Sequence, residues 1–271
     1  KANVDKIVES SDKPTFTNVI VALEESDQTL NQVSLTFFNL LSAESSDEMQ
    51  NIAKEFSPMI TRYSNDVGLN EKLFEKIKTV YEERNTSNLN QEEGMLLDKL
   101  YKNFSRNGAL LNEEDKGVLR KLDEELANLS LTYSDNILEE TNSFELIIDS
   151  KDELKGLTES ALEAAALSAK EKNLEGNWRF TLDYPSYVPF LTYVDSRELR
   201  EKMYRTFTSR AFKGDKLDNS ESVKRIVMLR QKRANLLGYK THADFILEER
   251  MAETPTNVME FLNNFLEKAK P

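Results

Sequence analysis

The sequence predicts a mainly α-helical protein: a multi-helix lobe with one short antiparallel β-ribbon. The first observation is that its 271 residues include only 8 glycines and 6 prolines, so few positions interrupt a helix. The second is that apolar residues between those positions recur near the 3.6-residue period of an α-helix. The third is that two short segments, at about 144–148 and 178–182, alternate with the two-residue period of a strand.

Four amphipathic helices are expected in the first part of the chain. The first is expected to begin at the cap region Thr15–Thr17, and the fourth to end near Gly108. Ser46 is a good N-cap for the second, because a serine oxygen can accept a free backbone N–H of the first turn. The apolar stripes of these helices cover residues 16–41, 49–63, 73–81 and 95–104.

The longest helix is expected to start at Asn112, because three acidic residues follow it at the positive end of the helix dipole. Thr158 caps an alanine-rich helix through about Glu171. The last helix has the clearest start signal, with Thr254 as N-cap and Pro255 at the first helical position. Three further helices are expected over residues 195–212, 221–237 and 242–252.

The two alternating segments flank the helix that starts at Thr158. Phe144, Leu146 and Ile148 alternate in the first segment, and Trp178, Phe180 and Leu182 alternate in the second. An antiparallel pair with an inserted helix is the economical arrangement. A boundary between helical subdomains could fall near residues 139–143 or 183–190.

Composition excludes several classes of partner and site. With 36 basic and 48 acidic residues the net charge is −12, whereas nucleic acids and anionic membranes attract a positive face. We therefore expect no nucleic-acid or membrane partner. The chain has no cysteine, which excludes disulfides and thiolate ligands and is consistent with a cytoplasmic location.

A single histidine, His242, limits the chemistry further. A zinc motif with two histidines cannot be built within this chain, and neither can a Glu-x-x-His di-iron site. His242 could act as a general base or a single ligand. The ordinary interpretation, which we favour, is a half-exposed residue in the first turn of the helix after Gly238.

Adjacent carboxylates are frequent but do not indicate an acid–base pair by themselves. Neighbouring residues of a helix point about 100° apart, whereas such a pair must face each other across a cleft. Solvated helix faces explain these doublets better. They are Glu24/Glu25, Glu82/Glu83, Glu92/Glu93, Glu113/Glu114, Asp123/Glu124/Glu125 and Glu139/Glu140.

Two further groups have a functional and an ordinary interpretation. The basic residues Lys224-Arg225, Arg230 and Lys232-Arg233 could clamp a carboxylate or phosphate, but more simply they balance an acidic surface. The turn Tyr184–Tyr187, followed by Phe190 and Tyr193, could line a pocket, although such aromatics more often belong to the core. The glycines never cluster, so no glycine-rich phosphate loop is present.

Six stretches of the chain carry a resemblance to one family. They are Pro14–Glu24, Asn107–Leu111, Ala127–Asn142, Leu157–Ala169, Leu236–Tyr239 and Met251–Pro255. In this order they resemble motifs of the thimet oligopeptidase group of zinc metallopeptidases, except that Val19 replaces the usual threonine in the first stretch. The dipeptidyl carboxypeptidase branch is the best likeness within the family.

The resemblance implies a nearly all-helical, two-lobed protein that hydrolyses short peptides in a deep channel and releases C-terminal dipeptides. In the family, two histidines of a His-Glu-x-x-His helix and a further glutamate hold zinc, and the intervening glutamate activates water. Residues 1–271 contain no such motif. We therefore expect no catalytic and no metal-binding residue in this chain, and we assign no substrate-binding residue from the sequence.

Residues 1–271 are accordingly expected to be an N-terminal helical lobe that walls the channel, inactive alone, with the catalytic zinc domain as its missing partner. The parent is expected to be a monomer, cytoplasmic or, if a signal was trimmed, periplasmic. One alternative is a non-enzymatic helical scaffold that binds a peptide or protein. Another is a hydrolase that uses two glutamates, which requires a carboxylate with a strongly raised pKa in a pocket.

Overall fold

The computed structural model describes residues 1–270 and is mainly helical, as predicted. The chain forms two compact units. Unit 1 consists of Lys1–Leu129 together with the chain from Ile226 onward, and unit 2 consists of Ser130–Arg225. The chain passes from one unit to the other within two helices, α7 (Glu113–Ser143) and α11 (Ser220–Leu236).

Unit 1 begins with helices whose bounds differ from the prediction at one point. The single helix expected over residues 16–41 is broken: a π-helical turn at Phe16–Val21 and α2 come first, and α3 starts only at Gln28. Ser26 and Asp27 lie at the break, and short polar side chains of this kind compete with the helical backbone. The helices are α1 (Ala2–Glu9), α2 (Ala22–Glu24), α3 (Gln28–Ala43), α4 (Asp47–Gly68), α5 (Glu71–Glu82) and α6 (Gln91–Phe104).

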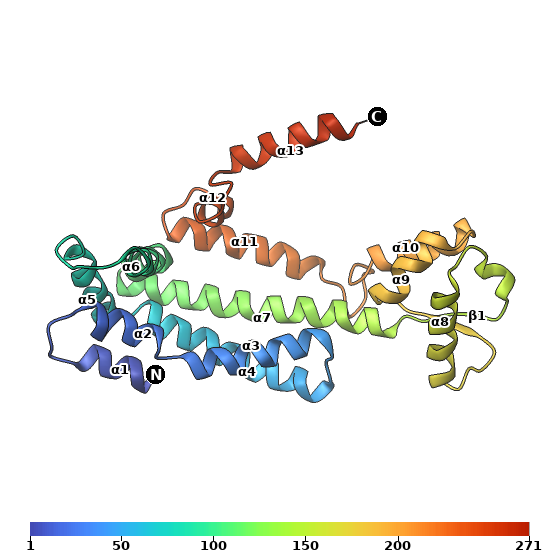
Figure 1. The fold of residues 1–271 in the computed structure, drawn as a ribbon, viewed down its shortest axis with the longest axis horizontal. Coiled ribbons are helices and arrows are strands. Elements are labelled where there is room, and N and C mark those ends of the chain that lie inside the picture. The colour runs from blue at the N-terminus through green and yellow to red at the C-terminus, as the bar shows by residue number, and fades with distance from the viewer. Residues whose placement is uncertain (271) are drawn as a thin grey trace. The chain divides into compact units, whose positions relative to one another are not determined.

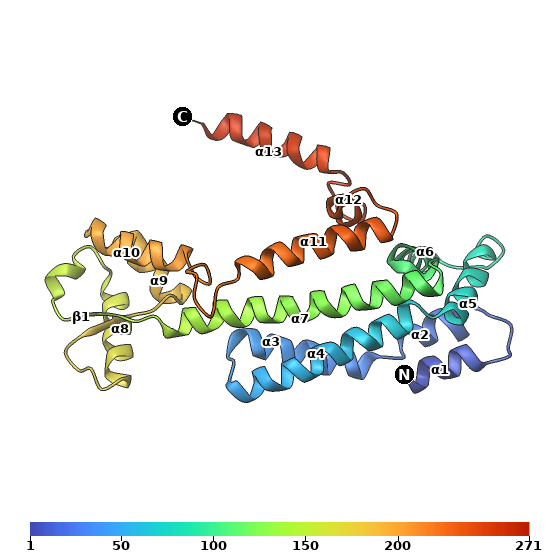
Figure 2. The same cartoon turned by 180° about the vertical axis from the view of Figure 1, so that it is seen from behind.

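The core of unit 1 lies between α1, the π-helical turn, α5 and α6. Ile20, Leu73, Ile77 and Leu97 are completely buried there, so the stripes predicted for residues 73–81 and 95–104 are confirmed. Helices α3 and α4 form an antiparallel pair that lies side by side in both views (Figures 1 and 2). Helix α3 buries none of its side chains fully.

Unit 2 contains the predicted ribbon. Strands β1 (Leu146–Ile148) and β2 (Trp178–Phe180) pair antiparallel, with Leu146 opposite Phe180. Helix α8 (Glu159–Glu171) connects them and packs on β2 (Figure 1). The core beneath the ribbon includes Phe180 and Phe190, whose rings meet edge to face at 4.6 Å. Local periodicity therefore identified both strands.

The expected turn at residues 184–187 is wrong, because these residues begin α9 (Tyr184–Tyr193). Pro185 lies in the first turn, where a missing N–H costs no helical hydrogen bond. The expected helices over 195–212 and 242–252 are shorter than predicted. They are α10 (Arg197–Thr208) and α12 (His242–Leu247), and α13 (Pro255–Ala269) follows.

Most predicted N-caps form their hydrogen bonds. Ser46 accepts from the N–H of Met49 at 3.2 Å, and Asn112 from that of Asp115 at 2.9 Å. Thr254 caps α13 in the same way, by accepting from the third residue of the helix. Thr158 occupies the N-cap position of α8 but makes no side-chain capping bond. Across residues 1–270, no helix is both long and apolar enough to span a bilayer.

Candidate functional site

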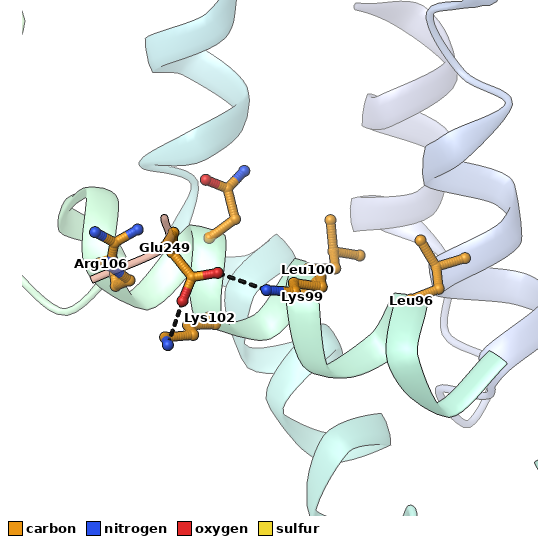
Figure 3. A pocket seen from close by; sticks show the side chains of 7 residues that line it. Leu96, Lys99, Leu100, Lys102, Arg106 and Glu249 are labelled. Atoms are coloured by element: carbon orange, nitrogen blue, oxygen red, sulfur yellow. Dashed lines mark hydrogen bonds and ion pairs between the residues drawn. The ribbon is translucent and has the colours of Figure 1, made fainter. Parts of the chain in front are cut away.

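A group of charged side chains in unit 1 joins the end of α12 to α6; we call it the Glu249 cluster (Figure 3). Lys99 and Lys102 of α6 both reach the carboxylate of Glu249, Lys99 at 2.6 Å. Arg106, two residues beyond the end of α6, pairs with Glu248 at 2.8 Å. Three cations on one helical segment thus meet two adjacent carboxylates.

Arg106 has the most partners in the Glu249 cluster. Its guanidinium donates to the hydroxyl of Tyr239 at 3.1 Å and to the backbone carbonyl of Phe245, and it lies 4.8 Å from the centre of the Phe245 ring. Its side chain is only 13% exposed. These contacts make Arg106 a structural link between the end of α6 and α12.

The backbone that presents Arg106 depends on Gly108. Residues Ser105–Ala109 form a π-helical turn in which Gly108 has a φ of 104°. A Cβ at this position would lie 2.6 Å from a methyl group of Leu119. Glycine is therefore required both by the positive φ and by the close approach of α7.

The carboxylates of the Glu249 cluster are held in their charged forms. Lys102 and then Lys99 lower the pKa of Glu249 to about 2. Burial opposes the ionisation of Glu248, but the Tyr239 hydroxyl and Arg106 hold its pKa below the usual range. Groups ionised in this way are fixed charges near neutral pH, so they suit a clamp between helices better than proton transfer.

A hollow of about 400 Å³ lies beside the Glu249 cluster. Figure 3 shows Lys99 and Lys102 directed to the same carboxylate rather than into free space. Leu96 and Leu100 supply its apolar wall. Because the lysine charges are already compensated, the hollow offers little attraction to an anion.

His242 lies where the ordinary interpretation put it, at the first residue of α12 and partly buried. Burial, followed by the positive charges of Arg230 and Arg233, lowers its pKa. Its Nδ1 atom is buried and has no hydrogen-bond partner within residues 1–270. The imidazole is therefore neutral near pH 7, with Phe245 as its ring neighbour at 6.3 Å.

The basic segment 224–233 does not form one clamp. Arg233 pairs with Asp123 of α7 at 2.7 Å and also donates to Asn107, and its side chain is 17% exposed. Lys224 pairs instead with Glu221 on its own helix. Arg233 thus fixes α11 against α7 inside unit 1. Its partner Asp123 is one of the adjacent carboxylates noted in the sequence, and this ion pair gives it a structural role.

The doublet Glu139/Glu140 in unit 2 is also engaged in structure. Glu140, with a side chain only 8% exposed, pairs with Lys213 and accepts from the backbone N–H of Ala211. Glu139 pairs with Lys216 at 3.0 Å. Both carboxylates therefore fasten the loop after α10 to the end of α7.

Four carboxylates have pKa values that are displaced below the usual range. A two-glutamate hydrolase needs the opposite, a carboxylate that stays protonated near neutral pH. The observed shifts therefore do not favour that alternative. The shifted carboxylates are Asp66, Asp218, Glu248 and Glu249.

The aromatic residues of α9 divide between core and surface. Tyr187 and Phe190 are buried, as the ordinary interpretation expects. Tyr184 and Tyr193 are exposed. A small hollow of about 140 Å³ opens beside Pro185, and three alanines of α8 are among its lining residues. The aromatic segment therefore does not form a single pocket wall.

Helix α13 presents an apolar face that nothing in residues 1–270 covers. Its five largest apolar side chains are each between 50% and 70% exposed, and none of its residues is fully buried. The five residues are Met259, Phe261, Leu262, Phe265 and Leu266.

The side chains of the described residues do not fit a zinc site. Among residues 1–270, no three histidine, cysteine, aspartate or glutamate side chains lie together as metal ligands would. With His242 as the only histidine in the sequence, the pair of imidazoles that the resemblance implies cannot form here.

Comparison with known proteins shows which helical proteins this chain is similar to. Residues 190–271 match Peptidase family M3. The dipeptidyl carboxypeptidase of Salmonella typhimurium is 32% identical over 100% of this chain and 40% of its own length. Oligopeptidase A of Haemophilus influenzae is 34% identical over 95% of this chain and 38% of its own length.

The resemblance found in the sequence is thereby confirmed, since the chain is similar to M3 peptidases. It spans about 40% of the length of these relatives. Oligopeptidase A of Escherichia coli is 32% identical over the whole chain, so identity does not separate the dipeptidyl carboxypeptidase branch from oligopeptidase A.

Proposed function

We propose that this chain is the channel-forming helical lobe of a metallopeptidase that hydrolyses short peptides and releases C-terminal dipeptides. The observation that carries the proposal is similarity along the whole chain to proteins named dipeptidyl carboxypeptidase and oligopeptidase A. Six motif stretches in the family's order agree with it. In this proposal residues 1–271 limit which peptides reach the reacting centre.

Zinc is the proposed metal of the parent protein, and its ligands are proposed to lie outside this chain. The single histidine supports this part, because the family's site requires two. We therefore expect the chain to hydrolyse no peptide by itself. The absence of cysteine supports a cytoplasmic location, and the proposed parent is a monomer that binds neither nucleic acid nor membranes.

The proposed partner of this lobe is the catalytic lobe of the same protein, which would cover the apolar face of α13. Phe261 and Phe265 are 70% and 64% exposed, and burial of such side chains is favourable by about 25 cal/mol per Å². The curated relatives are long enough to supply that lobe, since this chain spans only about 40% of them.

The test compares this chain with the full product of its gene on short peptides. One peptide has a free C-terminus and its twin is amidated, and mass spectrometry detects released dipeptides. We expect the full product to cleave only the free peptide and to lose activity with a zinc chelator. Cleavage within both peptides would instead indicate an oligopeptidase, and binding without cleavage would indicate the scaffold alternative.

A further inference from the structure

Unit 2 contains another hollow, larger than the one beside Pro185, and its charge balance differs from that of the Glu249 cluster. It has a volume of about 470 Å³ and lies on α9 and α10, which pack against each other (Figure 1). We call it the arginine hollow. Its lining residues are Leu191, Arg197, Arg200, Glu201, Tyr204 and Arg205.

The three arginines of the hollow differ in their partners. Arg205 pairs with Glu201 at 2.7 Å. Arg200 donates to the backbone carbonyls of Val194 and Asp195, which fixes its guanidinium but does not neutralise it. Arg197 is exposed and makes no hydrogen bond or ion pair in the part of the chain that the structure describes. The lining of the hollow thus contains three guanidinium groups and only one carboxylate.

This excess of positive charge is unusual in a chain whose net charge is −12. Arg197 is also the first residue of the 12-residue helix α10, where the helix dipole adds positive potential. Tyr204, 55% exposed, and Leu191 give the hollow an apolar wall next to these charges. A ligand that fits must combine a negative group with an apolar one.

We propose that the arginine hollow binds an acidic side chain of a peptide, with Arg197 and Arg200 facing its carboxylate and Tyr204 and Leu191 contacting the neighbouring apolar residue. A guanidinium presents parallel N–H groups that match a carboxylate. A nucleic acid fits less well, because an acidic chain repels a long polyanion. The inference rests on the proposed function in one respect. It takes from that function that the ligands are peptides, and it adds that they carry an acidic side chain.

The test measures binding to this chain, by fluorescence anisotropy of a dye-labelled peptide with one glutamate between leucines. The twin peptide has glutamine in place of glutamate, and both are amidated so that the side chain carries the difference. We expect the glutamate peptide to bind about tenfold more tightly, as a charge-assisted hydrogen bond allows. Equal binding of the two peptides would overturn the inference.

The variant Arg197→Gln should reduce binding of the glutamate peptide to the level of its twin, and Arg197→Lys should restore it only in part, because the guanidinium fork is lost. Lys170→Gln on α8 is the matched control, since it removes the same charge from an exposed site of unit 2. Unchanged binding in Arg197→Gln, or an equal loss in Lys170→Gln, would contradict the assignment.

Inorganic phosphate is the competitor that separates a peptide site from a general anion site. We expect millimolar phosphate to displace the peptide no better than the same ionic strength of sodium chloride. Displacement by phosphate alone would overturn the peptide assignment. This experiment measures binding and not hydrolysis. A negative result for the arginine hollow is therefore distinguishable from a full gene product that fails to cleave peptides.

Discussion

The Glu249 cluster and the arginine hollow contain the same kinds of side chain and differ in how the charge is balanced. In the cluster, Lys99 and Arg106 have carboxylate oxygens at 2.6 and 2.8 Å. In the hollow, Glu201 is occupied by Arg205, and Arg197 has no partner within residues 1–270. Balanced cations hold helices together, whereas an unbalanced cation remains available to a ligand.

Burial follows the same division. The Arg106 side chain is 13% exposed and lies against Phe245, whereas Arg197 is exposed at the start of α10. Removal of a structural cation should therefore reduce stability, and removal of a free one should reduce only binding. Variants in the two sites can test that distinction in order of expected effect.

The largest loss of stability is expected at Phe245. Its side chain is 8% exposed, and the guanidinium groups of Arg106 and Arg233 lie over its ring. Phe245→Ala should reduce the free energy of unfolding by about 3–5 kcal/mol, because it removes a buried ring and leaves a cavity beneath Arg106 and Arg233. Urea denaturation followed by circular dichroism measures the loss. Phe212→Ala, at a ring that is 70% exposed, is the control and should change stability by less than about 0.5 kcal/mol.

Arg106 should rank second. Arg106→Met should cost about 2–3 kcal/mol, since it removes the side-chain donor to the Phe245 carbonyl and one of the donors to the Glu248 carboxylate, which keeps the Tyr239 hydroxyl. The same denaturation experiment measures this loss, and Arg106→Lys should recover only part of it because lysine lacks the planar fork. A cost below about 0.5 kcal/mol would mean that the Glu249 cluster is not structural.

The sequence predicted the helices and the ribbon because their signals are local. The alternation of Phe144 to Ile148 and of Trp178 to Leu182 identified both strands, and Ser46 and Asn112 marked helix starts. Each of these signals depends on residues within a few positions of one another. The turn expected at Tyr184 is wrong because its local signal is ambiguous: a proline suits either a turn or the first turn of a helix.

The Glu249 cluster could not be predicted in the same way. Its lysines and carboxylates are about 150 positions apart in the chain, and only the tertiary packing of unit 1 brings them together. The spacing of Lys99, Lys102 and Arg106 was the available signal, because residues three or four apart share one helix face. The arginine hollow has the same kind of signal in Arg197, Arg200 and Arg205, but sequence alone does not reveal which arginines lack partners.

A smaller effect is expected from the ionisation of Glu249. Its pKa of about 2 lies below the usual value of 4.5, so the stabilisation is fully present above pH 4.5 and is lost as the pH falls towards 2. Carboxyl ¹³C chemical shifts against pH measure the midpoint directly. In Lys102→Gln the midpoint should rise, because Lys102 is the main cause of the depression. A midpoint near 4.5 in the unsubstituted chain would contradict the clamp.

The smallest change in stability is expected at Arg197, where Arg197→Gln should alter the free energy of unfolding by less than about 0.5 kcal/mol. Arg200→Gln provides the comparison within the same hollow and should cost about 1 kcal/mol, since it removes two donors to the carbonyls at the end of α9. Thermal unfolding of both variants measures the pair. If Arg197→Gln cost as much as Arg200→Gln, Arg197 would be a structural residue like Arg106, and the difference between the two sites would no longer predict where a ligand binds.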